Sequence, residues 1–323
     1  MVDVSVVVPI YNGEDDLPGL LACLQQQTYP RQSVSYLLVD NNSKDRTSEI
    51  LQDAARSPSL NQPAEIQSEA ASRLQIVPLL EDKIQSSYAA RNTGIRSTES
   101  EIIAFTDADC RPEPQWLEKL VEPFADARVG IVVGEIMALP GTTLLEQHAD
   151  RQDTLSQKHT LANKFCPYGQ TANLAIRRSV LQQVGLFRPY LTTGGDADLC
   201  WRAQKQTDYQ LHFAEQAVIK HRHRSTLKSL RSQWRRYGES NRYLHELHGV
   251  SLMPELKTKD YAYRLTRWFL KEVPTTGAKM VAGKADLVDL LSTPIGLFTA
   301  QARIKGQQQA KLPNEAQEIT RLP

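Results

Sequence analysis

The chain of 323 residues has little of what marks secreted, disulfide-bonded or membrane-spanning proteins. No uncharged apolar run approaches the roughly 18 to 20 residues that a helix needs to cross a bilayer. The first residues lack the basic-then-apolar pattern of a signal peptide. The four cysteines are far apart and form no Cys-x-x-Cys pair, so reduced thiols fit better than a disulfide framework or a zinc site. We therefore expect a cytoplasmic location, with the inner face of the membrane as the alternative.

The small net charge of +1 conceals an uneven distribution along the chain. Residues 1–219 hold 19 basic and 28 acidic side chains, whereas residues 220–310 hold 17 basic and 7 acidic ones. A basic region after an acidic body is typical of a surface for phosphates or for an anionic membrane face, and a solvated charged surface is the alternative. We do not expect a nucleic acid as partner, because the basic residues do not alternate with aromatic ones.

Strand-like and helix-like segments alternate through the first third of the chain. Apolar and β-branched runs predict four strands, in "VSVVVPIYN", "YLLV", "LQIVPLLE" and "EIIAFTDAD". Helical spacing follows each of the first three strands, and a Pro-, Ser- and Gln-rich stretch at 57–72 predicts a loop before the third strand. This alternation predicts an α/β fold with a mostly parallel sheet covered on both faces.

Polar side chains follow three of these four strands. Tyr11, Asp40 and Asp107 come where the first, second and fourth strands end, and Asp109 follows with only Ala108 between. In parallel sheets, ligands bind beyond the carboxyl ends of the strands, so the carboxylates can converge on one cleft. Such an oxygen site suits Mg²⁺ or Mn²⁺. The alternative is that the Asp-x-Asp pair only ends the strand and caps the following turn.

Six motifs then occur in a characteristic order: "VSVVVPIYNGEDDL", "LLVDNNSKDRT", "AARNTGI", "AFTDADCRPEPQWL", "TANLAIRRSVLQQVGLF" and "GGDADLCWRAQ". Their order and spacing resemble those of the family 2 glycosyltransferases, over roughly residues 2–240. The resemblance implies a GT-A fold, which is Rossmann-like with a mostly parallel central sheet and helices on both faces. It also implies transfer of a sugar from a nucleotide-diphosphate sugar with inversion at the anomeric carbon.

The resemblance assigns roles to the residues at the strand ends. It implies that the donor contacts Pro9, Tyr11, Asn12, Asp40, Arg91 and Asp107, with Asp40 accepting a hydrogen bond from the base. Asp109 would be the direct ligand of a Mn²⁺ or Mg²⁺ ion that bridges the two phosphates, and His221 would complete that site, with His223 as the second match. UDP-sugar is the favoured donor, with GDP- or dTDP-sugar as alternatives. A histidine packed in a basic loop is the alternative for His221.

An inverting transfer also needs a general base for the acceptor hydroxyl. The resemblance implies Asp196 in this role, although the family's usual Gly-Glu-Asp reads Gly-Gly-Asp here, with Gly195 in place of the glutamate. Asp198 is expected to open the following helix, where the N-terminal dipole favours a carboxylate. The alternative is that both aspartates only cap that helix. Residues predicted to bind the acceptor are Asn173, Gly194, Gly195 and Trp201.

The resemblance, together with charge and composition in the C-terminal part, divides the chain into three parts. Residues 1–224 would form the GT-A domain, with nucleotide binding at about 1–110 and acceptor binding at about 111–224. A basic helical region at 225–305, opened by Ser225, and a disordered polar tail at 306–323 would follow. The amphipathic helices could pack on the catalytic domain, form a homodimer or lie on an anionic membrane, and packing is favoured.

These observations predict a metal-dependent, inverting glycosyltransferase with a carbohydrate or lipid-linked acceptor. "QWRRYG" is similar to the Gln-x-x-Arg-Trp motif of processive synthases, but Tyr237 replaces the tryptophan, so we expect a single transfer. A sugar-phosphate nucleotidyltransferase is disfavoured, because the segment after the first strand is acidic rather than glycine-rich and basic. A non-catalytic binding protein that kept the fold is the remaining alternative.

Overall fold

The computed structural model describes residues 2–56 and 74–322, and the chain divides into two compact units. The sheet unit comprises Met1–Met137, Leu155–His221 and Pro313–Pro323, and the helical unit comprises Ala138–Thr154 and Arg222–Leu312. This division differs from the predicted boundary at residue 224, because one internal segment belongs to the helical unit and the last residues belong to the sheet unit. The loop predicted at 57–72 lies outside the described residues.

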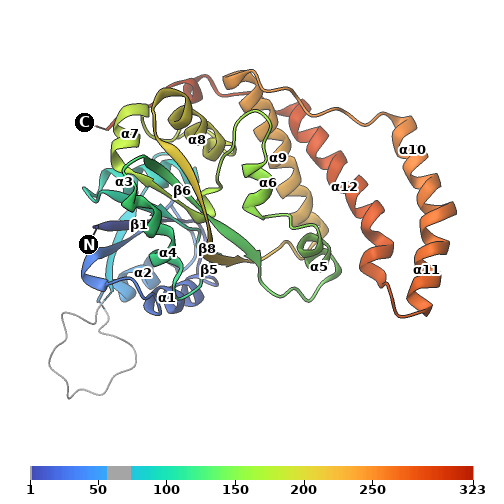
Figure 1. Ribbon diagram of the computed structural model, residues 1–323, viewed down its shortest axis with the longest axis horizontal. Helices are drawn as coiled ribbons and strands as arrows, with labels where there is room; N and C mark the ends of the chain where they lie inside the picture. Colours follow the sequence, from blue (N-terminus) through green and yellow to red (C-terminus); the bar gives the residue numbers. More distant parts are fainter. Residues whose placement is uncertain (1, 57–73, 323) are drawn as a thin grey trace, which may run out of the picture. The chain divides into compact units, whose positions relative to one another are not determined.

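One sheet organises the sheet unit (Figure 1). Among the described residues its strands are β1 (Val4–Ile10), β2 (Val34–Asp40), β3 (Gln75–Leu80), β4 (Ile102–Phe105), β5 (Cys110–Pro112), β6 (Val129–Ala138), β7 (Leu174–Arg177) and β8 (Gln210–His221). The strand order is β3-β2-β1-β4-β7-β6-β8-β5. The pairs β1–β2, β2–β3 and β1–β4 are parallel, as predicted, whereas β4–β7, β6–β7 and β5–β8 are antiparallel.

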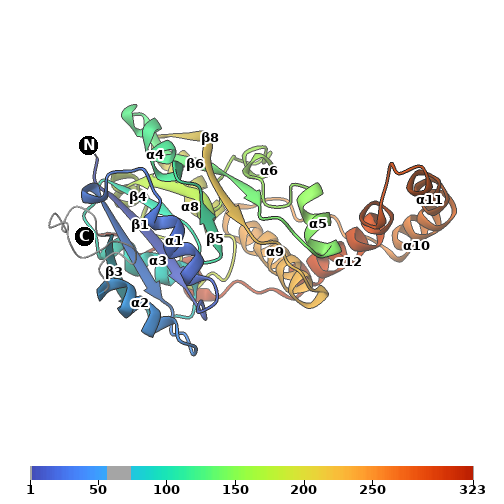
Figure 2. The same ribbon diagram turned by 90° about the horizontal axis from the view of Figure 1, so that it is seen from below.

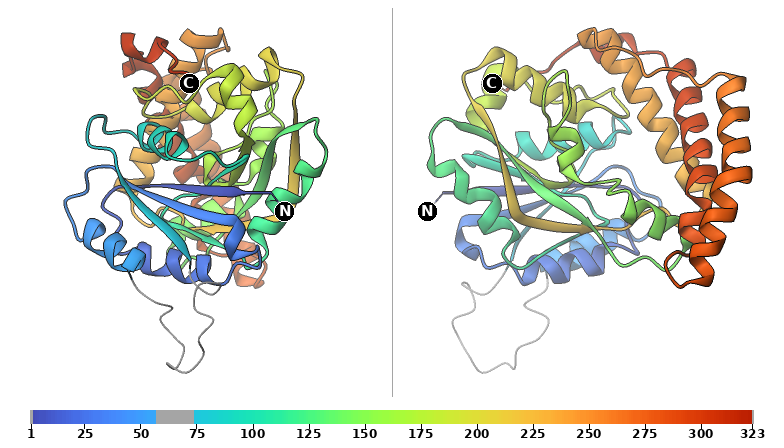
Figure 3. Two further views of the ribbon diagram at one scale, coloured as in Figure 1. Left: turned by 90° about the vertical axis from the view of Figure 1, so that its left-hand side faces the viewer. Right: turned by 45° about the vertical axis from the view of Figure 1, so that its right-hand side comes forward.

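Helices cover both faces of the parallel strands. Those of the sheet unit are α1 (Leu17–Gln25), α2 (Thr47–Arg56), α3 (Ser87–Arg96), α4 (Trp116–Val121), α6 (Gln157–Leu161), α7 (Arg178–Val184) and α8 (Gly195–Gln206). Figure 3 shows α1 and α2 on one face and α3 on the other. Right-handed crossovers explain this arrangement. The strands β1, β2 and β3 follow one another toward one edge of the sheet, and the chain then passes back over β1 and β2 to form β4 on the other side of β1. Val4 to Val8 are therefore all buried, as expected of a strand covered on both sides.

The helical unit is built on two long helices. Its elements are α5 (Leu144–Arg151), α9 (Leu227–His248), α10 (Thr258–Arg267), a π-helical turn η5 (Trp268–Glu272), α11 (Val273–Val281) and α12 (Leu287–Gln309). α9 and α12 approach closely at Gly238 and Gly306, where an added Cβ would lie 1.9 and 2.0 Å from carbonyl oxygens of the facing helix. The cap of α9 is Thr226, whose hydroxyl accepts from the Ser229 N–H, and not Ser225 as predicted.

The C-terminal residues differ from the predicted disordered tail. Residues 306–309 form the last turn of α12, and the short helix η6 (Asn314–Gln317) follows. Within the sheet unit, Ala316 is fully buried, Arg188 Nη1 donates to its carbonyl at 2.9 Å, and the Leu186 N–H donates to the Thr320 carbonyl at 2.8 Å. The polar composition suggested disorder, but these distant partners satisfy the backbone of the segment.

Candidate active site

Hydrogen bonds connect the loops that follow β1 and β2 at the carboxyl edge of the sheet. Asn12 has a positive φ of 50°, its N–H donates to the Ser43 hydroxyl at 2.8 Å, and its side-chain oxygen accepts from the Lys44 N–H at 2.8 Å. Tyr11 remains 54% exposed beside this junction. A rigid loop pair with an exposed aromatic ring is a suitable wall for a flat base.

Asp40 and Pro9 lie on neighbouring strands next to this junction. In the parallel register of β1 and β2, Pro9 is opposite Val39 and Ile10 is opposite Asp40. Asp40 is buried, and its Oδ1 accepts from the Ser43 N–H at 2.9 Å. This contact fixes the orientation of a carboxylate that the sequence assigns to the base of the donor. The roles of both residues in donor binding stay predictions.

A buried ion pair links α3 to the end of β4. Arg91 projects from α3, and its Nη2 lies 2.6 Å from Asp107 Oδ1. The arginine side chain is buried, whereas the aspartate remains partly exposed. The guanidinium also lies over the Tyr88 ring, 5.6 Å from its centroid. Arg91 therefore holds Asp107 in a defined orientation while leaving the carboxylate open on its other side.

Asp109 and His221 meet across an antiparallel strand pair. β5 and β8 place Cys110 opposite His221, and this register brings His221 Nε2 to 3.2 Å from Asp109 Oδ1. Adjacent ligands of an octahedral ion with bonds of about 2.1 Å lie about 3 Å apart, so this pair fits a Mg²⁺ or Mn²⁺ site. The Cys110 thiol lies within 4.8 Å of both. Burial raises the pKa of that thiol well above its usual value, which makes it a poor ligand.

Asp196 lies in the first turn of α8. Gly194 caps the helix with a left-handed φ of 82°, which glycine adopts without strain. The Thr171 hydroxyl donates to Asp196 Oδ1 at 2.9 Å. Burial raises the pKa of Asp196 above the usual value, the positive charge of Arg91 opposes this shift, and the negative charge of Asp107 adds to it. The predicted base is thus electrostatically coupled to the ion pair on the donor side.

Tyr88 explains the glycine that replaces the family's glutamate. A Cβ at Gly195 would lie 2.7 to 2.9 Å from atoms of the Tyr88 ring, and the Gly195 N–H donates to the Tyr88 hydroxyl at 3.0 Å. The ring therefore fills the space that a side chain at position 195 would need. We did not predict a role for Tyr88 from the sequence. Tyr88 precedes Arg91 by three residues, and side chains with this spacing lie side by side on a helix, so the proximity of Tyr88 to Arg91 could have been predicted.

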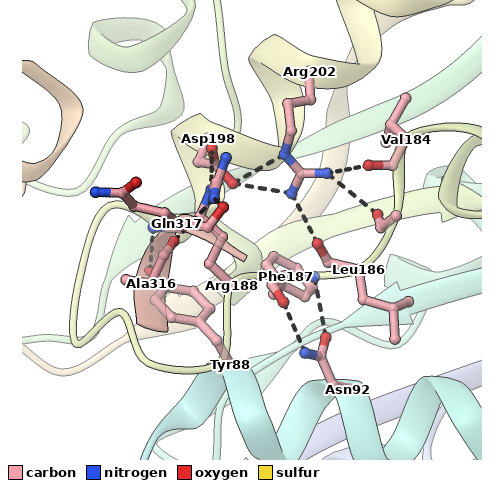
Figure 4. A network of polar contacts seen from close by, with 12 residues as sticks. Tyr88, Asn92, Val184, Leu186, Phe187, Arg188, Asp198, Arg202, Ala316 and Gln317 are labelled. Carbon is pink, nitrogen blue, oxygen red and sulfur yellow. Dashed lines mark hydrogen bonds and ion pairs between the residues drawn. The ribbon is translucent and has the colours of Figure 1, made fainter. Parts of the chain in front are cut away.

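Asp198 has a different environment from Asp196. Its carboxylate is fully buried between two guanidinium groups, with Arg188 Nε at 3.0 Å from Oδ1 and Arg202 Nη2 at 2.9 Å from Oδ2 (Figure 4). Arg202 also donates to the Val184 and Leu186 carbonyls. Asp198 does lie in the first helical turn as predicted, and its contacts are those of a structural ion-pair network.

Two family models match the chain: Glycosyl transferase family 2 over residues 5–185, and Glycosyl transferase family group 2 over residues 102–275. The chain belongs to glycosyltransferase family 2. The first match covers the strand ends with Asp40, Asp107 and Asp109, and the second reaches Asp196 and His221. The predicted family and its activity as a glycosyltransferase are confirmed.

Relatives of this glycosyltransferase include another glycosyltransferase and a sugar transferase named for undecaprenyl-phosphate. It is 34% identical over 233 residues to glycosyltransferase AglE of Haloferax volcanii, a match covering 72% of this chain and 71% of the relative. It is 31% identical to an undecaprenyl-phosphate 4-deoxy-4-formamido-L-arabinose transferase of Pectobacterium carotovorum, over 55% of this chain and 44% of the relative. This chain therefore spans less than half the length of the second relative.

A solved structure supports the GT-A fold of this glycosyltransferase. The mannosyltransferase PcManGT of Pyrobaculum calidifontis, in complex with GDP-Man and Mn²⁺, superposes with a TM-score of 0.56 at 20% identity. The match covers 95% of this chain and 88% of that one. The predicted fold class is confirmed. Over residues 2–56 and 74–322, no helix combines the length and apolarity that a membrane span requires.

Two predicted acceptor contacts of the glycosyltransferase are engaged in packing. Asn173 is fully buried, its amide donates to the Glu135 and Ala217 carbonyls, and its oxygen accepts from the Trp116 indole. Trp201 is 1% exposed and donates to the Cys166 carbonyl at 2.9 Å. Their acceptor roles stay untested predictions, and we leave both residues out of the proposed acceptor site.

Proposed function

We propose that this glycosyltransferase transfers a single sugar from a nucleotide-diphosphate sugar to an acceptor hydroxyl, with inversion at the anomeric carbon. The observation that carries the proposal is a chain of contacts: the Gly195 N–H, next to Asp196, donates to Tyr88, and the Tyr88 ring packs against Arg91 of the Arg91–Asp107 pair. These residues come from α8, α3 and the end of β4, which are far apart in the sequence. Their meeting at one edge of the sheet supports a donor side and a base side of one reaction centre.

The donor would lie along the carboxyl ends of β1, β2 and β4. The Tyr11 ring and the fixed Asp40 carboxylate suit a nucleotide base, and Asp107, held by Arg91, suits hydroxyl groups of the ribose or the sugar. Pro9 and Asn12 would shape the wall around the base. UDP-sugar is our favoured donor, and a GDP-sugar is the alternative because GDP-Man is bound in the structure of PcManGT.

Asp109 and His221 would hold a Mn²⁺ or Mg²⁺ ion. Their 3.2 Å separation and their oxygen and nitrogen atoms fit that ion. When bound, such an ion stabilises the negative charge that develops on the leaving diphosphate. Asp109 would orient the diphosphate side of the donor, and the β5–β8 pairing would hold His221 beside it.

Asp196 would take the proton of the acceptor hydroxyl. As the acceptor oxygen forms its bond to the anomeric carbon, the bond from that carbon to the diphosphate breaks and its electron pair leaves with the nucleoside diphosphate. The acceptor proton moves to an oxygen of Asp196, whose raised pKa makes it a stronger base than an ordinary carboxylate. Thr171 holds the carboxylate in place through its 2.9 Å hydrogen bond.

The acceptor would approach the backbone at Gly194. Gly194 has a positive φ and stays partly exposed at the start of α8, so its backbone is open to a substrate, whereas Gly195 is buried against Tyr88. A carbohydrate or a lipid-linked acceptor is proposed, and the name of the undecaprenyl-phosphate relative supports the lipid-linked class.

Two measurements test this function. A thermal-shift panel of UDP-, GDP-, dTDP- and ADP-sugars, each with Mn²⁺ and with a chelator, should show metal-dependent stabilisation by one nucleotide class. NMR of the product formed from that donor should show the anomer opposite to the donor's. Retention of configuration would contradict inversion. Donor binding without release of nucleoside diphosphate, with any acceptor tested, would favour the non-catalytic alternative.

A further inference from the structure

The helices α10 and α11 expose a long apolar and basic surface. Neither they nor the η5 turn between them bury a single residue. Tyr263, Phe269 and Leu270 are 67%, 66% and 68% exposed, and Val281 is 92% exposed. By contrast, α9 in the same unit buries Leu230, Tyr243 and Leu244. We call the four exposed residues together with Leu265 the apolar strip.

The other side of these helices is fixed to α12. Figures 1 and 2 show α12 between α9 and the pair formed by α10 and α11. The Trp268 indole donates to the Leu290 carbonyl at 2.8 Å, and the Thr293 hydroxyl donates to Glu272 at 2.6 Å. These contacts turn the inner side of the helices toward α12. The residues of the apolar strip stay exposed although the element that carries them is anchored to α12.

Exposed basic side chains accompany the apolar strip along the same segment. Residues 257–284 contain two acidic residues and seven exposed basic ones, which are Lys257, Lys259, Arg264, Arg267, Lys271, Lys279 and Lys284. The two acidic residues are engaged within the unit: Asp260 accepts from the Lys257 N–H at the start of α10, and Glu272 lies near Arg267 and accepts from Thr293. Residues 257–284 thus combine exposed apolar side chains with an excess of exposed positive charge.

We propose that the apolar strip and the exposed basic side chains of residues 257–284 bind the surface of an anionic lipid membrane. Amphipathic helices with large apolar residues and a lysine- and arginine-rich border lie in the headgroup region, where apolar side chains enter the acyl boundary and basic ones contact anionic headgroups. A second copy of the chain is a poorer occupant. Its identical face would bring two sets of seven basic side chains against each other.

Vesicle binding by the full chain tests the proposal. We expect co-sedimentation with vesicles that contain phosphatidylglycerol and much weaker binding to pure phosphatidylcholine. Raising the salt from about 0.1 M to about 1 M should release the protein, because the Debye length shrinks from about 10 Å to about 3 Å.

Two double variants separate the contributions to binding. In Lys271→Glu with Lys279→Glu, binding to anionic vesicles should fall by at least about 30-fold, since each lysine near such a surface contributes about fivefold. In Phe269→Ser with Leu270→Ser, the charge is unchanged and binding should fall at every salt concentration. All four side chains are exposed, so the melting temperature should stay close to that of the wild type.

Arg96→Glu with Arg128→Glu is the matched control. Both arginines are exposed in the sheet unit, and the change in net charge equals that of the lysine variant. The control should keep vesicle binding, and all variants should keep the donor-induced thermal shift, so a failure here is distinguishable from a failure of the proposed function. Equal binding to neutral and anionic vesicles, or equal loss in the control, would overturn the proposal. So would a wild-type dimer that the strip variants convert to monomer.

Discussion

Two Asp-x-Asp segments in the sheet unit use their carboxylates in different ways. In the first, Asp107 meets one arginine and Asp109 faces His221, and both remain partly exposed. In the second, Asp196 accepts from Thr171, whereas Asp198 is fully buried between Arg188 and Arg202. The sequence pattern of the two segments is the same. Their carboxylates differ in burial and in the number of arginine partners, and these differences distinguish carboxylates that can act on a ligand from Asp198, which stabilises the fold.

The energetic reason for this difference is desolvation. A fully buried carboxylate is tolerable only when cations and hydrogen bonds replace its water, so Asp198 is committed to Arg188 and Arg202. A carboxylate that keeps solvent access can exchange water for a metal ion, a hydroxyl or a proton. Asp196 lies between these limits, and its raised pKa reflects that position.

Of the substitutions proposed here, removal of the candidate metal ligand in the first segment should have the largest effect. Asp109→Asn should abolish metal-dependent binding of nucleoside diphosphate, because the amide oxygen carries no negative charge to hold the ion. Binding with Mn²⁺ and with a chelator, measured by calorimetry, checks this. Asp208→Asn, at an exposed aspartate away from both segments, is the control and should bind normally. An unchanged Mn²⁺ dependence in Asp109→Asn would remove Asp109 from the metal site.

Removal of the proposed base should affect turnover without affecting the donor. Asp196→Asn should lower kcat by roughly 10²- to 10⁴-fold with nearly unchanged nucleotide-sugar affinity, since a general base acts only as the new bond forms. If Asp196 only stabilised the first turn of α8 through the helix dipole, the variant would lose up to about 1 kcal/mol of stability and keep its turnover. Turnover, donor affinity and melting temperature of this single variant decide between the two roles.

The same substitution at Asp198 should give the opposite result. Asp198→Asn leaves two buried arginines without their shared carboxylate, so the free energy of unfolding should fall by about 3 to 5 kcal/mol. Urea unfolding measures this loss. The fraction that stays folded at low temperature should turn over at close to the wild-type rate. A stable but inactive Asp198→Asn would show that the comparison between the two aspartates is wrong.

A methyl group at Gly195 should cost less stability than the loss of the buried carboxylate in Asp198→Asn. Gly195→Ala places a Cβ within 2.7 Å of the Tyr88 ring, and overpacking of this kind costs about 1 to 3 kcal/mol. Thermal melting of Gly195→Ala, Tyr88→Ala and the double variant gives the coupling between the two positions. We expect the double variant to lose less stability than the two single losses together, and strict additivity would show that the ring does not limit residue 195.

The smallest effect should be a shift in pH dependence. Asp196 must be ionised to accept a proton, so turnover should fall as the pH drops through its pKa, which burial raises above the usual aspartate value. Thr171→Val removes a hydrogen bond that favours the ionised form. The acid limb of the pH–rate profile should therefore move to higher pH in that variant. A shift to lower pH, or none, would argue against Asp196 as the titrating base.

The position of Tyr11, Asp40 and Asp107 at one edge of the sheet could be predicted because each lies at the end of a strand or just after it. Strand runs and their polar ends are local patterns, and parallel pairing brings Tyr11, Asp40 and Asp107 to one edge whatever the loops between them. Tyr88 and Thr171 could not be predicted in the same way. Their contacts with Gly195 and Asp196 join residues 107 and 25 positions apart in the sequence, and nothing local to either residue indicates its partner.

The sequence by itself determined the fold class, the order of the first strands and helices, and the family, because apolar periodicity and short motifs record them locally. Only the tertiary structure decided which aspartate is buried, what fills the space at Gly195, and that residues 313–322 are ordered against the sheet unit. Each of these depends on which distant groups replace water around a side chain or a peptide bond. That replacement is a property of the packed molecule, so composition and spacing along the chain do not record it.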